Sequence, residues 1–107
     1  MLGLGNSIIS GSALEDAFSL TSISGLQAWY KFNTNLTYSG TSVTAWADSS
    51  GNGNDLTQTT ATNQGVKTSP VGGVHLDGND NFMALDTALD LTTFTVFACI
   101  TLDGTSL

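Results

Sequence analysis

The segment Trp46-Ala47-Asp48-Ser49-Ser50-Gly51-Asn52-Gly53-Asn54-Asp55-Leu56 carries most of the sequence's information about the fold. A tryptophan ends a short apolar run, and a turn built of Asp, Ser, Gly and Asn follows it. Short polar side chains hydrogen-bond their own backbone, and Gly and Asn accept the left-handed conformation that sharp reversals need. A similar corner returns at Leu76-Asp77-Gly78-Asn79-Asp80-Asn81-Phe82. Two such corners between β-type segments predict an all-β, antiparallel β-sandwich.

Segments with strand-like alternation of apolar and other residues flank both corners. These segments are residues 26–32, 43–46, 55–58, 74–76 and 82–85. The strongest alternation covers residues 93–102, and because both of its faces are uncharged, it favours a strand inside a sheet. Residues 59–73, rich in Thr, Asn, Gln and Gly, are expected to form a loop.

Residues 1–22 differ from the rest because Gly and Ser interrupt every apolar cluster. We interpret them as an extended N-terminal docking arm, with a disordered tail as the open alternative. Residues 23–107 then form the β-domain. The side chains expected to dock the arm are Met1, Leu2, Leu4, Ile8, Ile9, Leu14 and Phe18.

Charge excludes some partners. The chain of 107 residues has nine Asp and Glu against two Lys and Arg, a formal net charge of -7. Nucleic acids are bound through clustered Lys and Arg, so we expect no nucleic-acid partner. Anionic membrane surfaces are disfavoured for the same reason, and no segment has the ~18 apolar residues of a membrane span. Only 10% of the residues are charged, which fits extracellular, virion or fibre proteins better than cytosolic ones.

Residues 26–32, 43–54 and 74–82, followed by 94–98, together resemble the LamG-like (concanavalin A-like) jelly roll. The closest resemblance is to the divergent domains found in virion structural proteins of tailed bacteriophages. Residues 43–54 match the Asp-Ser-Gly-Asn-Gly corner of that family, and residues 74–82 are similar to its Phe-Asp-Gly corner. Such domains run well past the strand that ends near Leu102. We therefore expect a truncated sandwich: either the chain is a fragment, or a partner completes the sheet.

The resemblance implies a non-enzymatic virion structural protein that docks by its N-terminal arm. Its lectin-like β-domain would serve assembly, decoration or attachment of a fibre. The expected partners are other virion proteins, in a homo-oligomer or symmetric assembly, and the expected location is the virion.

Catalytic patterns are missing from the sequence. Glycoside hydrolysis needs two carboxyl groups across a sugar, yet the only glutamate is Glu15, in the arm, and no predicted strand carries alternating carboxylates. The single histidine, His75, and the single cysteine, Cys99, are expected to pack in or near the core. One His and one Cys cannot complete a tetrahedral zinc shell. We predict that the protein is not an enzyme and carries no cofactor.

Calcium is the alternative to a cofactor-free domain, because the two corners offer hard oxygen ligands. The candidate ligands are Asp48, Asn52, Asn54, Asp77 and Asp80. The family resemblance implies that some members bind calcium near such loops. Our main interpretation is that these side chains form Asx-turns that shape the corners.

The alternative function is that of a carbohydrate-binding module that recognises host surface glycans. Sugars stack on exposed aromatic rings and hydrogen-bond to amide side chains. The candidate residues are Tyr38, in a polar segment, with Asn52 and Asn79 in the two corners. Trp46 is instead expected to pack under the first corner.

Overall fold

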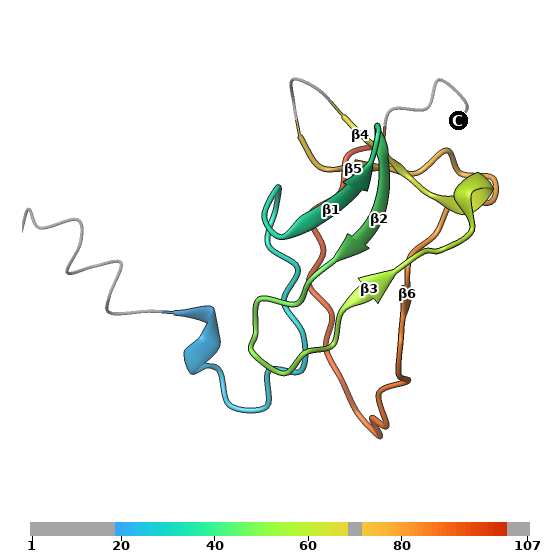
Figure 1. Ribbon diagram of the computed structural model, residues 1–107. Helices are drawn as coiled ribbons and strands as arrows, with labels where there is room; N and C mark the ends of the chain where they lie inside the picture. The colour runs from blue at the N-terminus through green and yellow to red at the C-terminus, as the bar shows by residue number, and fades with distance from the viewer. Residues whose placement is uncertain (1–18, 69–71, 103–107) are drawn as a thin grey trace, which may run out of the picture.

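The computed structural model describes residues 19–68 and 72–102, and in this part of the chain β-strands dominate (Figure 1). Six short strands form one curled antiparallel sheet, so the all-β prediction is confirmed. Only two short 3-10 turns accompany them among these residues, and no helix here is long and apolar enough to cross a membrane. The elements are η1 (Leu20–Ser22), β1 (Leu36–Ser39), β2 (Ser42–Trp46), β3 (Leu56–Thr57), η2 (Ala61–Asn63), β4 (Val66–Lys67), β5 (Val74–His75) and β6 (Ala84–Leu85).

Strand β2 is the centre of the sheet. Its first edge pairs with β1, from Leu36 opposite Trp46 to Ser39 opposite Ser42, with an irregularity between Thr37 and Tyr38. The two strands form a tight hairpin, in which Gly40 takes the left-handed conformation (φ 64°) that a sharp reversal requires.

The other edge of β2 pairs with two short strands in succession. Strand β3 pairs with the end of β2, and β4 pairs with its beginning at Ser42. Next to them, β6 pairs with β3 and β5 pairs with β4. The sheet is therefore four strands wide, with β1 on one side of β2 and two interrupted strands on the other.

Both interruptions contain eight residues, 58–65 between β3 and β4 and 76–83 between β5 and β6. They are joined to each other: the backbone N–H of Phe82 donates to the carbonyl of Asn63 at 3.1 Å. Buried Gln58 donates from Nε2 to the carbonyl of Phe82 at 3.1 Å, and its Oε1 accepts from the backbone N–H of Thr60 at 3.0 Å. The two excursions thus leave the sheet together, and the strand register is the same on both sides of them.

Gly65, at the end of the first excursion, lies close against the backbone of β5. A Cβ atom at this position would lie 2.7 Å from the carbonyl oxygen of His75 and 2.8 Å from side-chain atoms of Val74 and Leu76. The Gly65 carbonyl also accepts from the N–H of Val43 at 2.8 Å, so the backbone cannot easily move away.

Replacing Gly65 with alanine should therefore lower the free energy of unfolding by about 2 kcal/mol, the ordinary cost of overpacking. Urea denaturation measures the change. The control is Thr59→Ala, an exposed position on the same excursion, which should stay within about 0.5 kcal/mol of the parent. Equal stability of the two variants would contradict the close approach.

The core is small. Val43 has no exposed surface, and no other hydrophobic side chain among residues 19–68 and 72–102 is buried to a similar degree. Several large side chains are exposed instead, including Phe94 at 70% and Phe97 at 94%. Folded domains bury most of the apolar surface of their chain, so this sheet leaves one apolar side to be covered.

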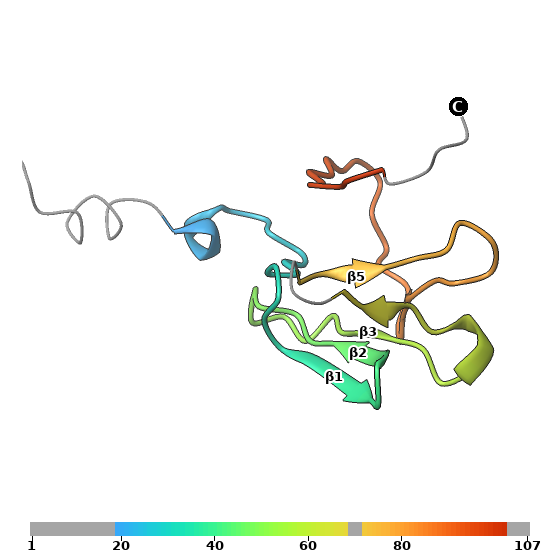
Figure 2. The ribbon, with the colours of Figure 1, turned by 90° about the horizontal axis from the view of Figure 1, so that it is seen from above.

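The structure differs from the sequence-based expectations in four segments. Residues 26–32 are not in the sheet, because side chains of the first corner hold them in place of a strand ladder. The expected loop at 59–73 contains β4, and β1 was missed. Residues 93–102 form no strand, and no hydrogen bond joins them to another residue that the structure describes. In Figure 2 this segment lies away from the sheet.

Candidate functional site

The first corner, residues 48–55, is organised by the carboxylate of Asp48. Its Oδ1 accepts from the backbone N–H groups of Trp29 and Ser50, each at 2.8 Å. Its Oδ2 accepts from the hydroxyl of Ser50 at 2.6 Å and from the N–H of Asn54 at 3.2 Å. The bond from the Ser50 N–H closes an Asx-turn, and the bond from the Asn54 N–H holds the far end of the corner against the same carboxylate.

The same corner fixes the segment that precedes β1. The Nδ2 of Asn52 donates to the carbonyls of Leu26 at 2.7 Å and Gln27 at 3.1 Å. The Nδ2 of Asn54 donates to the carbonyl of Gln27 at 2.7 Å. The amides thus satisfy carbonyls that would otherwise need a neighbouring strand.

Hydrogen bonding also determines the charge of the corner. Burial alone would raise the pKa of Asp48, but the hydrogen bonds from Ser50, Trp29 and Asn54 outweigh it and hold the pKa below its ordinary value of 3.8. Burial raises the pKa of Tyr30, and the negative charges of Asp48 and Asp55 raise it further. Asp48 is therefore a stable anion and Tyr30 a stable neutral phenol at neutral pH.

Two aromatic rings pack beside the first corner. The ring centroids of Tyr30 and Trp46 lie 5.8 Å apart, with the planes tilted by 58°. The Tyr30 hydroxyl donates to the carbonyl of Asn54, and the Trp46 Nε1 donates to the carbonyl of Lys31 at 3.2 Å. These contacts connect the corner, the preceding segment and the end of β2 into one cluster.

The second corner is a separate Asx-turn. The Oδ1 of Asp77 accepts from the backbone N–H groups of Asn79 at 3.0 Å and Asn81 at 3.3 Å. The N–H of Asn79 is the main cause that lowers the pKa of Asp77, against a smaller opposing effect of burial. The Nδ2 of Asn81 donates to the carbonyl of Thr62 at 3.4 Å, so this corner packs on the excursion that contains η2.

The candidate calcium ligands are divided between the two corners. Asp48, Asn52 and Asn54 lie before β3, and Asp77 and Asp80 lie beside the excursion that follows it, at the opposite end (Figures 1 and 2). Among the described residues, no group of three His, Cys, Asp or Glu side chains is placed to hold a metal ion. Both oxygens of Asp48 already accept protein donors, and a bound cation would have to displace them.

The melting temperature should therefore not change between millimolar calcium and excess chelator. Ligand binding to the native state alone raises stability, so a specific site would shift the unfolding curve upward. Differential scanning fluorimetry on Trp29 and Trp46 gives the readout, with magnesium as the control for ionic strength. A calcium-specific rise in melting temperature would contradict this prediction.

The candidate sugar-binding residues do not share one surface. Tyr38 lies on β1, Asn52 in the first corner and Asn79 in the second. The Nζ of Lys67 lies 4.7 Å from the centroid of the Tyr38 ring and covers a face on which a sugar would stack. Asn52 uses its amide nitrogen to brace the backbone. The structure therefore places the three candidates on three different elements and does not bring them together into one binding surface.

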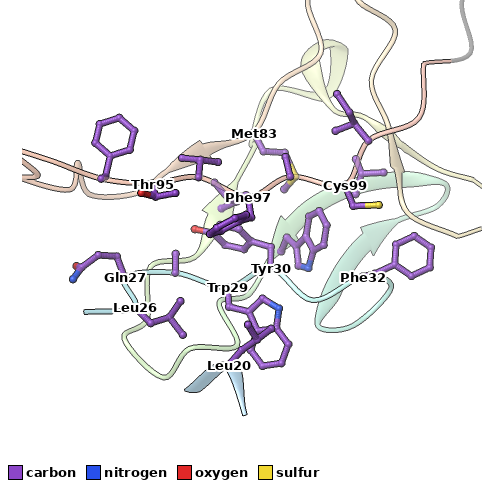
Figure 3. Close-up of a pocket in the computed structure, with 18 of the residues that line it drawn as sticks. Leu20, Leu26, Gln27, Trp29, Tyr30, Phe32, Met83, Thr95, Phe97 and Cys99 are labelled. Atoms are coloured by element: carbon purple, nitrogen blue, oxygen red, sulfur yellow. The ribbon is translucent and has the colours of Figure 1, made fainter. Parts of the chain in front are cut away.

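The described residues also form an open apolar groove, which the sequence did not predict (Figure 3). One wall is the segment before β1, with Leu26, Trp29 and Tyr30, and Met83 also lines the groove. The other wall is residues 93–102. None of the lining residues is Asp, Glu, Lys or Arg, although the chain as a whole carries a net charge of -7.

The groove also corrects the expected position of Cys99. This side chain was expected in the core, but it is exposed on the 93–102 wall, while His75 is half-buried on β5. The reason is that no strand pairs with the wall among residues 19–68 and 72–102. The alternating pattern of residues 93–102 indicated an apolar segment. It does not determine whether another layer covers that segment.

The side chains expected to dock the arm, Met1, Leu2, Leu4, Ile8, Ile9, Leu14 and Phe18, lie outside the described residues. Comparison of the chain with protein families, curated proteins and solved structures found no match.

Proposed function

We propose that the chain is a non-enzymatic structural module of a bacteriophage particle, built as part of a LamG-like, concanavalin A-like sandwich. Its uncharged groove is covered by protein in the assembled particle. The observation that carries the proposal is the wall formed by residues 93–102, which exposes Phe94, Val96, Phe97, Ile100 and Leu102 by 70% or more. A contiguous exposed apolar surface of this kind is typical of a protein interaction site.

The shape of the sheet supports a sandwich. A curled antiparallel sheet buries one face against a second layer, and the groove lies where such a layer would pack. Surface chemistry supports a protein partner, because interface cores are depleted in charged residues and enriched in aromatic residues and Met. The groove, with Trp29, Tyr30, Phe97 and Met83, has this composition.

The properties of the carboxylates support a non-enzymatic role. A general acid in glycoside hydrolysis needs a raised pKa, so that it is protonated near neutral pH. The pKa of Asp48 is lowered and its oxygens are used by the corner, while the side chain of Asp55 accepts from the Asp48 N–H at 2.8 Å. Both carboxylates act as hydrogen-bond acceptors that hold the backbone.

Mass spectrometry of gradient-purified particles tests the proposed function. Peptides of this chain should be recovered from intact particles in a fixed ratio to the major structural proteins. A chain found in the infected-cell lysate but absent from the particles would overturn the proposal. Retention of the protein on host polysaccharide, lost in a Tyr38→Ala variant and kept in Thr59→Ala, would favour the carbohydrate-binding alternative.

A further inference from the structure

The wall formed by residues 93–102 has the sequence pattern of a β-strand but is not paired with another described strand. Its apolar and β-branched residues alternate with a period of two, and no hydrogen bond joins it to another described residue. Unpaired backbone N–H and C=O groups on an extended segment are a template for an added strand. The occupant must therefore be extended, uncharged and apolar on at least one face.

Residues 1–9 of the chain meet this description. Written as a strand, Met1-Leu2-Gly3-Leu4-Gly5-Asn6-Ser7-Ile8-Ile9 places Leu2, Leu4 and Ile8 on one face together with the polar Asn6. The other face has the small residues Gly3, Gly5 and Ser7 in its middle and Met1 and Ile9 at its ends. A large apolar face can fill the groove, and a face of small residues can approach other backbone closely. The first charged side chain of the chain is that of Glu15, so the side chains of the segment match the uncharged groove.

The lengths and the attachment point also agree. Nine residues in a strand span about 30 Å, close to the roughly 33 Å of the ten residues 93–102. The described chain begins at Ser19, and Leu20 and Ile23 just after it already line the groove. Residues 10–18 between the two parts can extend about 30 Å, enough to reach the groove of the same copy or of an adjacent one.

We propose that residues 1–9 of this chain dock in the groove as an added β-strand beside residues 93–102, with Leu2, Leu4 and Ile8 directed into it. This assignment rests on the proposed function and gives the N-terminal arm its site: docking within one copy closes the groove, and docking between copies links neighbouring subunits.

Disulfide trapping in the full chain tests the proposal, because Cys99 is the only cysteine and lies exposed on the groove wall. Leu2→Cys, Leu4→Cys and Ile8→Cys each add one thiol to the proposed strand. A disulfide forms readily only when the two Cα atoms approach within about 7 Å, so it reports direct adjacency. The matched control is Ser12→Cys, which lies on the same arm outside the docked segment.

At least one of the three variants should form its bond to Cys99 about tenfold faster than Ser12→Cys, because docking raises the local thiol concentration. Peptide mapping identifies the bond, and a non-reducing gel separates a link within one copy from a link between copies; either link supports the proposal. Rates equal to the Ser12→Cys control in all three variants would overturn it. The outcome is separate from the particle test: a chain present in particles without this disulfide keeps the proposed function and loses the assigned occupant.

A second measurement covers the case in which an added cysteine disturbs docking. Leu4→Asp should increase the fluorescence of an apolar dye bound to the full chain, because a charged residue releases the strand and uncovers the groove. Ser12→Asp adds the same charge outside the segment and should leave the fluorescence unchanged. Equal dye binding by the two variants would contradict docking of residues 1–9.

Discussion

Replacing Trp46 with alanine should lower the free energy of unfolding by about 3 kcal/mol, within the range of truncations of large aromatic side chains. Trp46 is half-buried and ends β2, where it packs on the ring of Tyr30 at 5.8 Å. Its Nε1 also donates to the carbonyl of Lys31. Removal of the indole therefore separates the sheet from both the corner and the preceding segment.

The variant Trp46→Phe divides this effect into two parts. Phenylalanine keeps a ring beside Tyr30 but loses the bond to the Lys31 carbonyl and the second ring of the indole. It should therefore cost more than about 1 kcal/mol, the usual net value of one hydrogen bond, and less than Trp46→Ala. Chemical denaturation followed by tyrosine fluorescence or circular dichroism measures both variants. If Trp46→Ala were no less stable than Trp46→Phe, the aromatic cluster would not stabilise the fold.

Replacing Asp48 with asparagine should lower the free energy of unfolding by about 2 kcal/mol, allowing for the partial exposure of the site. Asparagine keeps one acceptor oxygen for the N–H groups of Trp29 and Ser50. It presents an NH₂ group where Oδ2 accepts from the Asn54 N–H, and two donors then face each other. Asp90→Asn, at an exposed position, removes the same charge and should stay within about 0.5 kcal/mol of the parent.

The pH dependence of stability gives an independent readout of Asp48. Because its pKa is lower in the folded state than its ordinary value of 3.8, the unfolded chain binds more protons near pH 4. The stabilisation from Asp48 is therefore complete above the unfolded pKa and is lost as the pH falls through the folded pKa. The parent should lose stability below about pH 4 more steeply than Asp48→Asn. Parallel pH profiles would show that the hydrogen bonds do not stabilise the carboxylate.

The local part of each corner could be predicted from the sequence, and its distant partners could not. The bonds from Asp48 to Ser50 and from Asp77 to Asn79 join residues two positions apart, so residue type determines them. The bond from Asp48 to the N–H of Trp29 spans 19 residues and depends on tertiary structure. Sequence alone therefore identified the corners but not the segment that they fix.

The strands show the same division. Strand β2 was predicted nearly at its observed bounds because its pattern is local and its core residue, Val43, is fully buried. Strand β4 has two residues and no measurable period, and it exists only because Gly65 lets β5 approach. A signal for β1 was present, since Leu36 and Tyr38 alternate with polar residues before Gly40, but the neighbouring asparagines concealed it.

Residues 93–102 show where a correct pattern gives an incomplete answer. The alternation predicted a strand in the interior of a sheet, but strand formation needs a partner backbone as well as a pattern. In the described chain that partner is missing, and the side chains predicted to be buried line an open groove. The open groove depends on tertiary structure, whereas the alternation of residues 93–102 is a local property of the sequence.

Hydrogen exchange of residues 93–102 in purified particles is the most direct test of the central claim that this apolar segment is covered in the assembled state. We expect its backbone amides to exchange as slowly as those of β2, because a neighbouring strand would satisfy and shield them. Exchange of residues 93–102 at the rate of an unstructured peptide, beside protected β2 amides in the same particles, would contradict the account.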